Sequence, residues 1–176
     1  MESKGLFTYT TKIEASKTIA EIQENLVAHG AKSVMANYTD HGTIEALSFM
    51  IATPEGKLMG IRLPCDPKPV FEVLESQASG NYRHPITNKI IKIPRSYVNM
   101  DQALRVAWRI VKYWVEAQMA LLETQMVKME QIFLPYAIVK GGRTLFEAMK
   151  EDKFKLLEAK IETGEKSKDA IDGEIV

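Results

Sequence analysis

Cations gather in one part of the chain, between Tyr82 and Lys112. This stretch of 31 residues holds seven lysines and arginines but one acid, Asp101, although the 176-residue chain is balanced at 23 basic and 23 acidic residues. A neutral protein with such a segment has a polarised surface, and cationic surfaces attract polyanions such as nucleic acid. The seven cations are Arg83, Lys89, Lys92, Arg95, Arg105, Arg109 and Lys112.

The spacing of these residues predicts how they could form one surface. Arg105, Arg109 and Lys112 are four and three residues apart, which places them on one face of a helix. The other four cations lie in a preceding loop with His84, and Tyr82 and Tyr97 bracket that loop as candidates for stacking on bases. Arg62, on a predicted strand, is a further candidate. The alternative is a solvated loop and a helix face that neutralises acids such as Glu72, Glu75, Glu116 and Glu123.

The sequence gives little indication of metal binding or of nucleophilic catalysis. The histidines, His29, His41 and His84, are not at helical spacing from one another, and Cys65 is the only cysteine, so we predict no metal site and no cofactor. Cys65 would need a nearby general base to act as a nucleophile, and a structural thiol is the simpler interpretation. Without a recognisable catalytic set, the chain is not expected to be an enzyme.

Two further patterns have simple structural interpretations. Residues 141–144 (Gly-Gly-Arg-Thr) resemble an anion-binding helix start, but a plain loop between helices is the more common arrangement. Glu116, Glu123 and Glu130 recur every seven residues on one predicted helix stripe. A carboxylate metal cluster would need partners from other helices, so a solvated face is expected instead.

Composition predicts one domain over residues 1–162 and a flexible acidic tail over 163–176. Apolar residues make up 45% of the chain, enough for a core. No apolar run approaches the ~20 residues of a membrane span. The first residues lack the pattern of a secretory signal, and a single cysteine excludes an intramolecular disulfide. These features predict a cytoplasmic protein that does not bind membranes.

The first half of the chain predicts a strand, a helix and a meander. Residues 7–13 alternate and are rich in Thr and aromatic residues, as in a strand. Ser16 or Thr18 is predicted to cap a helix, with Thr18 and Glu21 as a capping box, that stops before Gly30. Three strands follow over residues 33–38, 43–52 and 57–63. Their short turns favour antiparallel pairing.

The second half is predicted to be mainly helical. A short helix over 67–75 precedes a loop over 79–94, with a small hairpin near 85–89 and a short strand at 90–93. A helix from Asn99 or Asp101 to about Gln131 would span ~45 Å, more than the small sheet can cover, so part of it is expected to contact another chain. The alternative is a helix that breaks and folds back. Thr144 is predicted to cap a last helix to about Glu162.

Together these elements predict an α+β fold: an antiparallel sheet of three to four strands packed by helices, with one long helix in the second half. Several segments resemble small proteins of phages and prophages, a resemblance that implies no particular activity. These segments are Thr18 to Gln23, His29 to Ala31, Val106 to Arg109, Trp114 to Gln118, Phe133 to Ala137 and Gly142 to Glu147.

The order of elements is also similar to the core of phage single-strand annealing proteins of the RecT/Red-beta type. That resemblance implies rings or filaments that hold DNA in a basic groove and pair complementary strands without ATP. The sequence therefore favours a homo-oligomeric protein of phage type that binds or anneals single-stranded DNA in recombination or replication, in the host cytoplasm if phage-encoded. The alternative is a module that binds a host or phage protein, such as an inhibitor, through the Met-rich helix face of Met119, Met126 and Met129.

Overall fold

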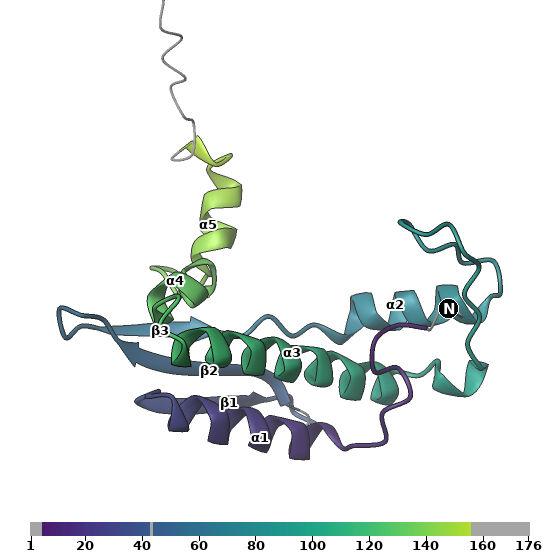
Figure 1. The fold of residues 1–176 in the computed structure, drawn as a ribbon, viewed down its shortest axis with the longest axis horizontal. Helices are drawn as coiled ribbons and strands as arrows, with labels where there is room; N and C mark the ends of the chain where they lie inside the picture. The colour runs from purple at the N-terminus through teal and green to yellow at the C-terminus, as the bar shows by residue number, and fades with distance from the viewer. Residues whose placement is uncertain (1–4, 43, 156–176) are drawn as a thin grey trace, which may run out of the picture.

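The computed structural model describes residues 5–42 and 44–155, which form a three-stranded antiparallel sheet with helices (Figure 1). The strands occur in the order β1-β2-β3, and the α+β prediction is confirmed. The elements are α1 (Ala15–Ala28), β1 (Ser33–Tyr38), β2 (Ile44–Ala52), β3 (Leu58–Arg62), α2 (Pro67–Ala78), η1 (Arg95–Tyr97), α3 (Met100–Glu123), α4 (Met129–Phe133), η2 (Leu134–Tyr136) and α5 (Leu145–Glu151).

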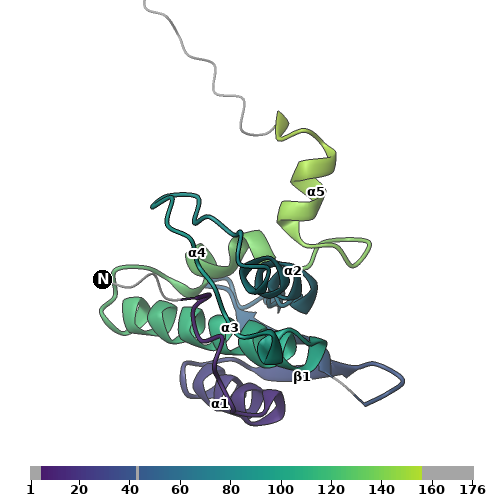
Figure 2. The same ribbon diagram turned by 90° about the vertical axis from the view of Figure 1, so that its right-hand side faces the viewer.

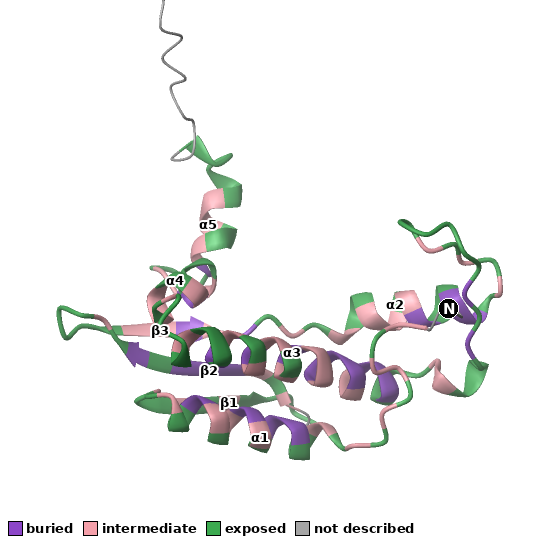
Figure 3. Cartoon of the chain, in the orientation of Figure 1, coloured by how far each residue is buried: buried purple, intermediate pink, exposed green. Residues whose placement is uncertain are grey.

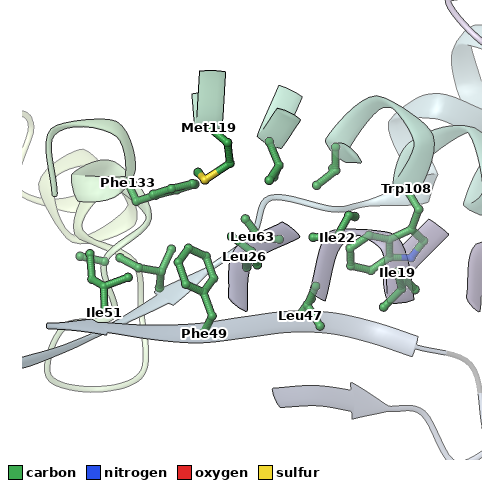
Figure 4. Close-up of a cluster of buried hydrophobic side chains, with 14 residues drawn as sticks. Ile19, Ile22, Leu26, Leu47, Phe49, Ile51, Leu63, Trp108, Met119 and Phe133 are labelled. Carbon is green, nitrogen blue, oxygen red and sulfur yellow. The ribbon is translucent and has the colours of Figure 1, made fainter. Parts of the chain in front are cut away.

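One face of the sheet carries the main core. Alternate residues of β2, namely Leu47, Phe49 and Ile51, are buried against α1 and α3, because successive side chains of a strand point to opposite faces. The register places Phe49 between Val34 of β1 and Ile61 of β3. Helices therefore cover the face to which these residues belong, and Figure 4 shows how their side chains meet.

Aromatic residues close this core at the end of the sheet. Phe133 of α4 is fully buried and meets the ring of Phe49 edge to face, with 5.1 Å between centroids. Trp114 of α3 packs edge to face on the ring of Phe133, with 5.6 Å between centroids. The chain then adds a short pairing to β3, where the Ile138 N–H donates to the Gly60 carbonyl over 2.7 Å. The chain thus pairs with β3 through an antiparallel bridge, between Ile61 and Ala137, beside the three-stranded sheet.

A second, smaller cluster lies between α2 and the first turns of α3. It consists of Leu74, Ala78, Ile91, Ile93 and Ala103, all buried. Helix α3 contributes to both clusters, because it begins beside Ala103 and ends beyond Met119 in the main core. Asn99 caps this helix by accepting a hydrogen bond from the Gln102 N–H over 2.8 Å. The helix therefore fixes the position of the small cluster relative to the sheet.

The strand predicted over residues 7–13 is wrong. These residues form turns, with Tyr9 N–H donating to the Leu6 carbonyl and Thr11 N–H to the Thr8 carbonyl. No described strand lies beside them to supply a ladder; instead the Gln102 amide donates to the carbonyls of Tyr9 and Thr11 at 2.7 and 2.9 Å. The alternation thus reflects Tyr9 packing against Tyr97, at 5.2 Å between centroids, and not a strand.

The predicted cap of the first helix is also wrong. Helix α1 begins at Ala15 with Glu14 as its N-cap, and no side chain caps it. Thr18 lies one turn inside the helix, fully buried, where its N–H donates to the Glu14 carbonyl over 3.1 Å. The three strands of the meander and the helix predicted over 67–75 are present, and that helix continues to Ala78.

The long helix does not run to Gln131. It ends at Glu123, and Gln125 adopts a left-handed φ of 57° that an α-helix does not accommodate. The N–H groups of Gln125 and Met126 then donate to the carbonyls of Leu122 and Leu121, as at a closed helix end. The chain reverses and returns Phe133 to the core, which confirms the alternative of a helix that breaks and folds back. Its 24 residues extend ~36 Å.

The last helix is shorter than predicted. Thr144 caps α5, as predicted, and the structure adds a capping box with Glu147, but the helix ends at Glu151. Lys153 and Phe154 both have left-handed φ values, of 54° and 56°, which explains why the helix does not continue. The rest of the predicted helix, residues 156–162, and the predicted tail over 163–176 lie outside the described residues.

Candidate nucleic-acid interface

The three cations predicted on the long helix point toward α1 and pair with acids. Arg105 contacts Glu14 at 3.0 Å and Asp101 at 2.7 Å. Arg109 contacts Glu21 at 2.9 Å. Lys112 contacts Glu21 at 3.5 Å and also pairs with Glu116.

This charge network joins two helices, and two of its cations are largely shielded from water. The side chains of Arg109 and Lys112 are 12% and 13% exposed. Partial desolvation alone would raise the pKa of Glu21, but the hydrogen bond from Arg109 and the charges of Lys112 and Arg109 outweigh it and lower that pKa. These three cations therefore do not join the loop surface and instead hold α3 against α1. The alternative interpretation of the sequence, a helix face that neutralises acids such as Glu116, agrees with this arrangement.

The loop between α2 and η1 contains the predicted hairpin. Arg83 and Ile90 form an antiparallel bridge, and the Ile91 N–H donates to the Tyr82 carbonyl over 3.0 Å. His84 N–H donates to the Lys89 carbonyl over 2.9 Å. We call residues 82–95 the basic hairpin segment. In both views it projects beyond α2 and the start of α3 (Figures 1 and 2).

The tip of this hairpin is held by its own polar groups. His84 Nδ1 accepts hydrogen bonds from the N–H groups of Ile86 and Thr87, each at 3.2 Å, so the ring proton lies on Nε2. Asn88 takes a left-handed φ of 54° and its N–H donates to the His84 carbonyl over 2.8 Å. The Arg83 guanidinium donates to the Asn88 carbonyl at 3.3 Å. His84 is thus a structural residue of the turn.

The base of the segment is anchored in the small cluster. Ile91 and Ile93 are buried there, and Tyr82 and Tyr97 pack on the cluster as partly buried side chains. The ring of Tyr97 also meets that of Tyr9. The two tyrosines predicted to stack on bases are therefore engaged in packing beneath the hairpin.

The cations of the segment lie on the outside. Arg83, Lys89, Lys92 and Arg95 are all exposed. Figure 3 shows much of the projecting segment as exposed. Among residues 5–42 and 44–155, no acid forms an ion pair within 4 Å of Arg83, Lys92 or Arg95. Ile86, at the tip, is 88% exposed, and Ile90 is 54% exposed. Sequence reasoning missed these apolar residues as candidates, although the turn-forming neighbours His84, Pro85 and Asn88 mark Ile86 as a tip residue.

Arg62 belongs to a different part of the surface. It is the last residue of β3, which Figure 1 shows apart from the hairpin, and its charge helps to lower the pKa of Glu147, after the hydrogen bonds of Glu147 with Thr144. Arg62, Leu63, Cys65 and Asp66 line two open grooves of about 700 and 660 Å³. Arg62 is thus not part of the basic hairpin segment.

The remaining candidates have structural explanations. Burial, followed by the charge of Asp66, raises the pKa of the Cys65 thiol to about 12, so Cys65 is protonated at neutral pH and is a poor nucleophile. Residues 141–144 form a loop in which the Val139 N–H donates to the Arg143 carbonyl, and Glu147 occupies the Thr144 N–H. In the described part of the chain, no three His, Cys, Asp or Glu residues are placed to share a metal ion.

The three glutamates predicted on one helix stripe do not share one helix, because α3 ends at Glu123. Glu116 pairs with Lys112, and Glu123 accepts a hydrogen bond from His29 Nε2 over 2.8 Å. Glu130 lies on α4, beyond the chain reversal. The three carboxylates thus have separate surroundings.

The chain matches no protein-family model, no curated protein and no solved structure. None of the helices in the described segments combines the length and the apolar character that crossing a bilayer requires.

Proposed function

We propose that this protein binds nucleic acid, with single-stranded DNA favoured, through the basic hairpin segment. The observation that supports the proposal is the set of exposed cations on a projecting hairpin whose base is anchored in a buried cluster. The proposal is narrower than the one from sequence: it retains Arg83, Lys89, Lys92 and Arg95 and omits the paired cations of α3. A role in phage-type recombination or replication in the cytoplasm remains part of this proposal.

The mechanism is electrostatic at its first step. Lysine and arginine side chains contact phosphates and release the cations condensed on the strand, so the logarithm of the binding constant falls linearly with the logarithm of salt concentration. A hairpin tip closed by its own hydrogen bonds loses little entropy on binding, since the tip is already ordered. The expected interaction is sequence-tolerant and strongly salt-dependent.

The test uses fluorescence anisotropy of a labelled oligonucleotide, single-stranded and duplex, from about 50 to 200 mM salt. The variant is the triple charge reversal Lys89→Glu, Lys92→Glu and Arg95→Glu. For three lost phosphate contacts, the slope of log K against log salt should become shallower by about 2 on single strands, and the affinity should fall at least ~tenfold. Thermal stability should change little, because exposed charges contribute little to folding.

A matched control separates local from net charge. Lys17→Glu, Lys32→Glu and Lys57→Glu alter three exposed lysines outside the hairpin and change the total charge by the same amount. The proposal predicts nearly unchanged affinity for this control relative to the hairpin variant. Equal losses in both triple variants, or absence of binding by the natural protein at about 50 mM salt, would refute it.

The alternative function, a protein-binding module, has less support from the geometry. Of the Met-rich face on which it depends, Met119 is buried in the main core at 2% exposure, and Met126, at 71%, lies beyond the end of α3. A homo-oligomer also remains a proposal, but α3 ends at Glu123, so its length no longer indicates a contact with another chain. Light scattering on the purified protein measures the number of copies, and a pull-down free of nucleic acid tests for a protein partner.

A further inference from the structure

The hairpin tip combines an exposed apolar side chain, a backbone held by hydrogen bonds and flanking cations. Ile86 is 88% exposed, the most exposed large apolar side chain among the described residues. The backbone that carries it is fixed by the His84 ring, which accepts from both the Ile86 and Thr87 N–H groups. Cations lie on either side, with Arg83 on one strand and Lys89 on the other. A single exposed apolar residue needs no explanation by itself. An apolar residue that is held in place between exposed cations is positioned to contact the same ligand as those cations.

We infer that Ile86 inserts between neighbouring bases of the nucleic acid bound by the hairpin and separates them. The inference rests on the proposed function and assigns the base-contacting group of the same surface. Apolar side chains such as isoleucine enter base steps in this way in proteins that unstack or kink nucleic acid. The preferred ligand is nucleic acid whose stack opens at low cost: a single strand or, in a duplex, a flexible pyrimidine–purine step.

Three observations favour this role for Ile86 over stacking on tyrosine. Tyr82 and Tyr97 are engaged in the small cluster and are not presented at the tip. Isoleucine is β-branched, so little rotamer freedom is lost when it is clamped between bases. Ile90, 54% exposed and paired with Arg83 across the hairpin, adds apolar surface behind the tip. The cations would hold the sugar-phosphate backbone while the tip contacts the base faces.

The experiment measures binding and unstacking in the same sample. The probe is an oligonucleotide that carries 2-aminopurine at alternate positions, whose fluorescence rises when neighbouring bases separate, together with an anisotropy label. The natural protein should raise both signals. Ile86→Ser should lose the 2-aminopurine rise and about tenfold in affinity, comparable to one base contact, while Ile86→Val should retain most of both. Met126→Ser, at another exposed apolar residue, is the matched control and should behave as the natural protein.

The outcomes separate this inference from the function on which it rests. Increased anisotropy without a 2-aminopurine rise, or an equal rise with Ile86→Ser, would overturn the insertion of Ile86 and leave binding by the hairpin intact. Absence of an anisotropy change with the natural protein would overturn both. Because Ile86 is so exposed, the melting temperature of Ile86→Ser should match that of the natural protein, so a loss of signal reports on contact with bases and not on folding.

Discussion

Glu21 of α1 joins this helix to two cations of α3. Its carboxylate accepts a hydrogen bond from Arg109 over 2.9 Å and lies 3.5 Å from Lys112. These two cations are mostly buried, so water does not replace the carboxylate when it is removed. Glu21 therefore compensates two positive charges that lie beside the apolar contact between the helices.

Glu21→Gln is expected to lower the free energy of unfolding by about 1–2 kcal/mol, between the values for exposed and buried ion pairs. The measurement is urea denaturation at neutral pH. Glu24→Gln, an exposed glutamate on the same helix, is the control and should change stability by less than about 0.5 kcal/mol. Equal effects of the two substitutions would mean that helix propensity, not the charge network, determines the loss.

Charges within this network were assigned to the wrong surface by sequence spacing. The four- and three-residue spacing of Arg105, Arg109 and Lys112 correctly places them on one helix face. The spacing does not show whether that face is exposed or packs against another helix. The acid that pairs with Arg109 is Glu21, which lies 88 residues away in the chain. An ion pair between distant segments becomes visible only when the helices are packed.

At the scale of elements, His29 links the last turn of α1 to the end of α3. Its Nδ1 lies 2.7 Å from the Asn25 carbonyl and its Nε2 2.8 Å from Glu123. Both partners are acceptors, so both ring nitrogens can donate only in the protonated form. The Asn25 carbonyl, followed by Glu123, therefore raises the pKa of His29.

This raised pKa makes part of the stability depend on pH. The contribution of His29 is fully present below its unfolded pKa of about 6.5 and is lost as pH rises through the higher folded pKa. Because Glu123 is mostly exposed, the expected loss is below about 1 kcal/mol. Urea denaturation at several pH values from about 6 to 8 should show this decline. His29→Gln should flatten it and His41→Gln, in an exposed turn, should not; a decline that persists in His29→Gln would contradict the assignment.

Elements were predictable where local pattern and tertiary contacts agree. The meander follows from alternation and short turns, and the hairpin near Pro85 from turn residues. The strand prediction for residues 7–13 was wrong because an alternating sequence arises wherever every second residue packs, with or without a neighbouring strand. The end of α3 was missed because the apolar spacing continues to Phe133 through a chain reversal, and spacing reports no direction.

At the scale of the whole molecule, two buried clusters share one helix. The smaller cluster carries the hairpin and is closed by residues 5–13, which are held by two glutamines. Gln77 accepts a hydrogen bond from the Leu6 N–H over 2.9 Å, and Gln102 donates to the carbonyls of Tyr9 and Thr11. Both glutamines are buried, so their amides replace the strand partner that this segment lacks.

Gln102→Leu is expected to destabilise the protein by about 1–3 kcal/mol, because it leaves the carbonyls of Tyr9 and Thr11 without a donor. Denaturation gives the size of the loss, and amide hydrogen exchange locates it: protection should fall at Leu6, Ile91 and Ile93, which belong to the smaller cluster or close it. Gln23→Leu, on α1, is the control. A loss of protection spread equally over β2 would show that the two clusters unfold together.

The hairpin was predictable and its exposed tip was not. Turn residues encode where the chain reverses, whereas the orientation of Ile86 depends on the His84 ring and on the anchoring of Ile91 and Ile93 beneath it. The same anchoring removed Tyr82 and Tyr97 from the candidate surface. Composition thus identified the cationic segment, and packing decided which of its residues face outward.

The position of Gly5 affects how the protein should be prepared. A Cβ atom there would lie 2.7 Å from the Ile93 side chain and 2.9 Å from the ring of Tyr9, so the chain enters the fold through a gap that admits only glycine without displacement. Ile93 belongs to the base of the basic hairpin segment. A purification tag joined close to Gly5 would therefore be tethered near the candidate DNA-contacting loop, where a histidine-rich tag would itself attract phosphate. Affinities are best measured with the tag removed or placed after Val176.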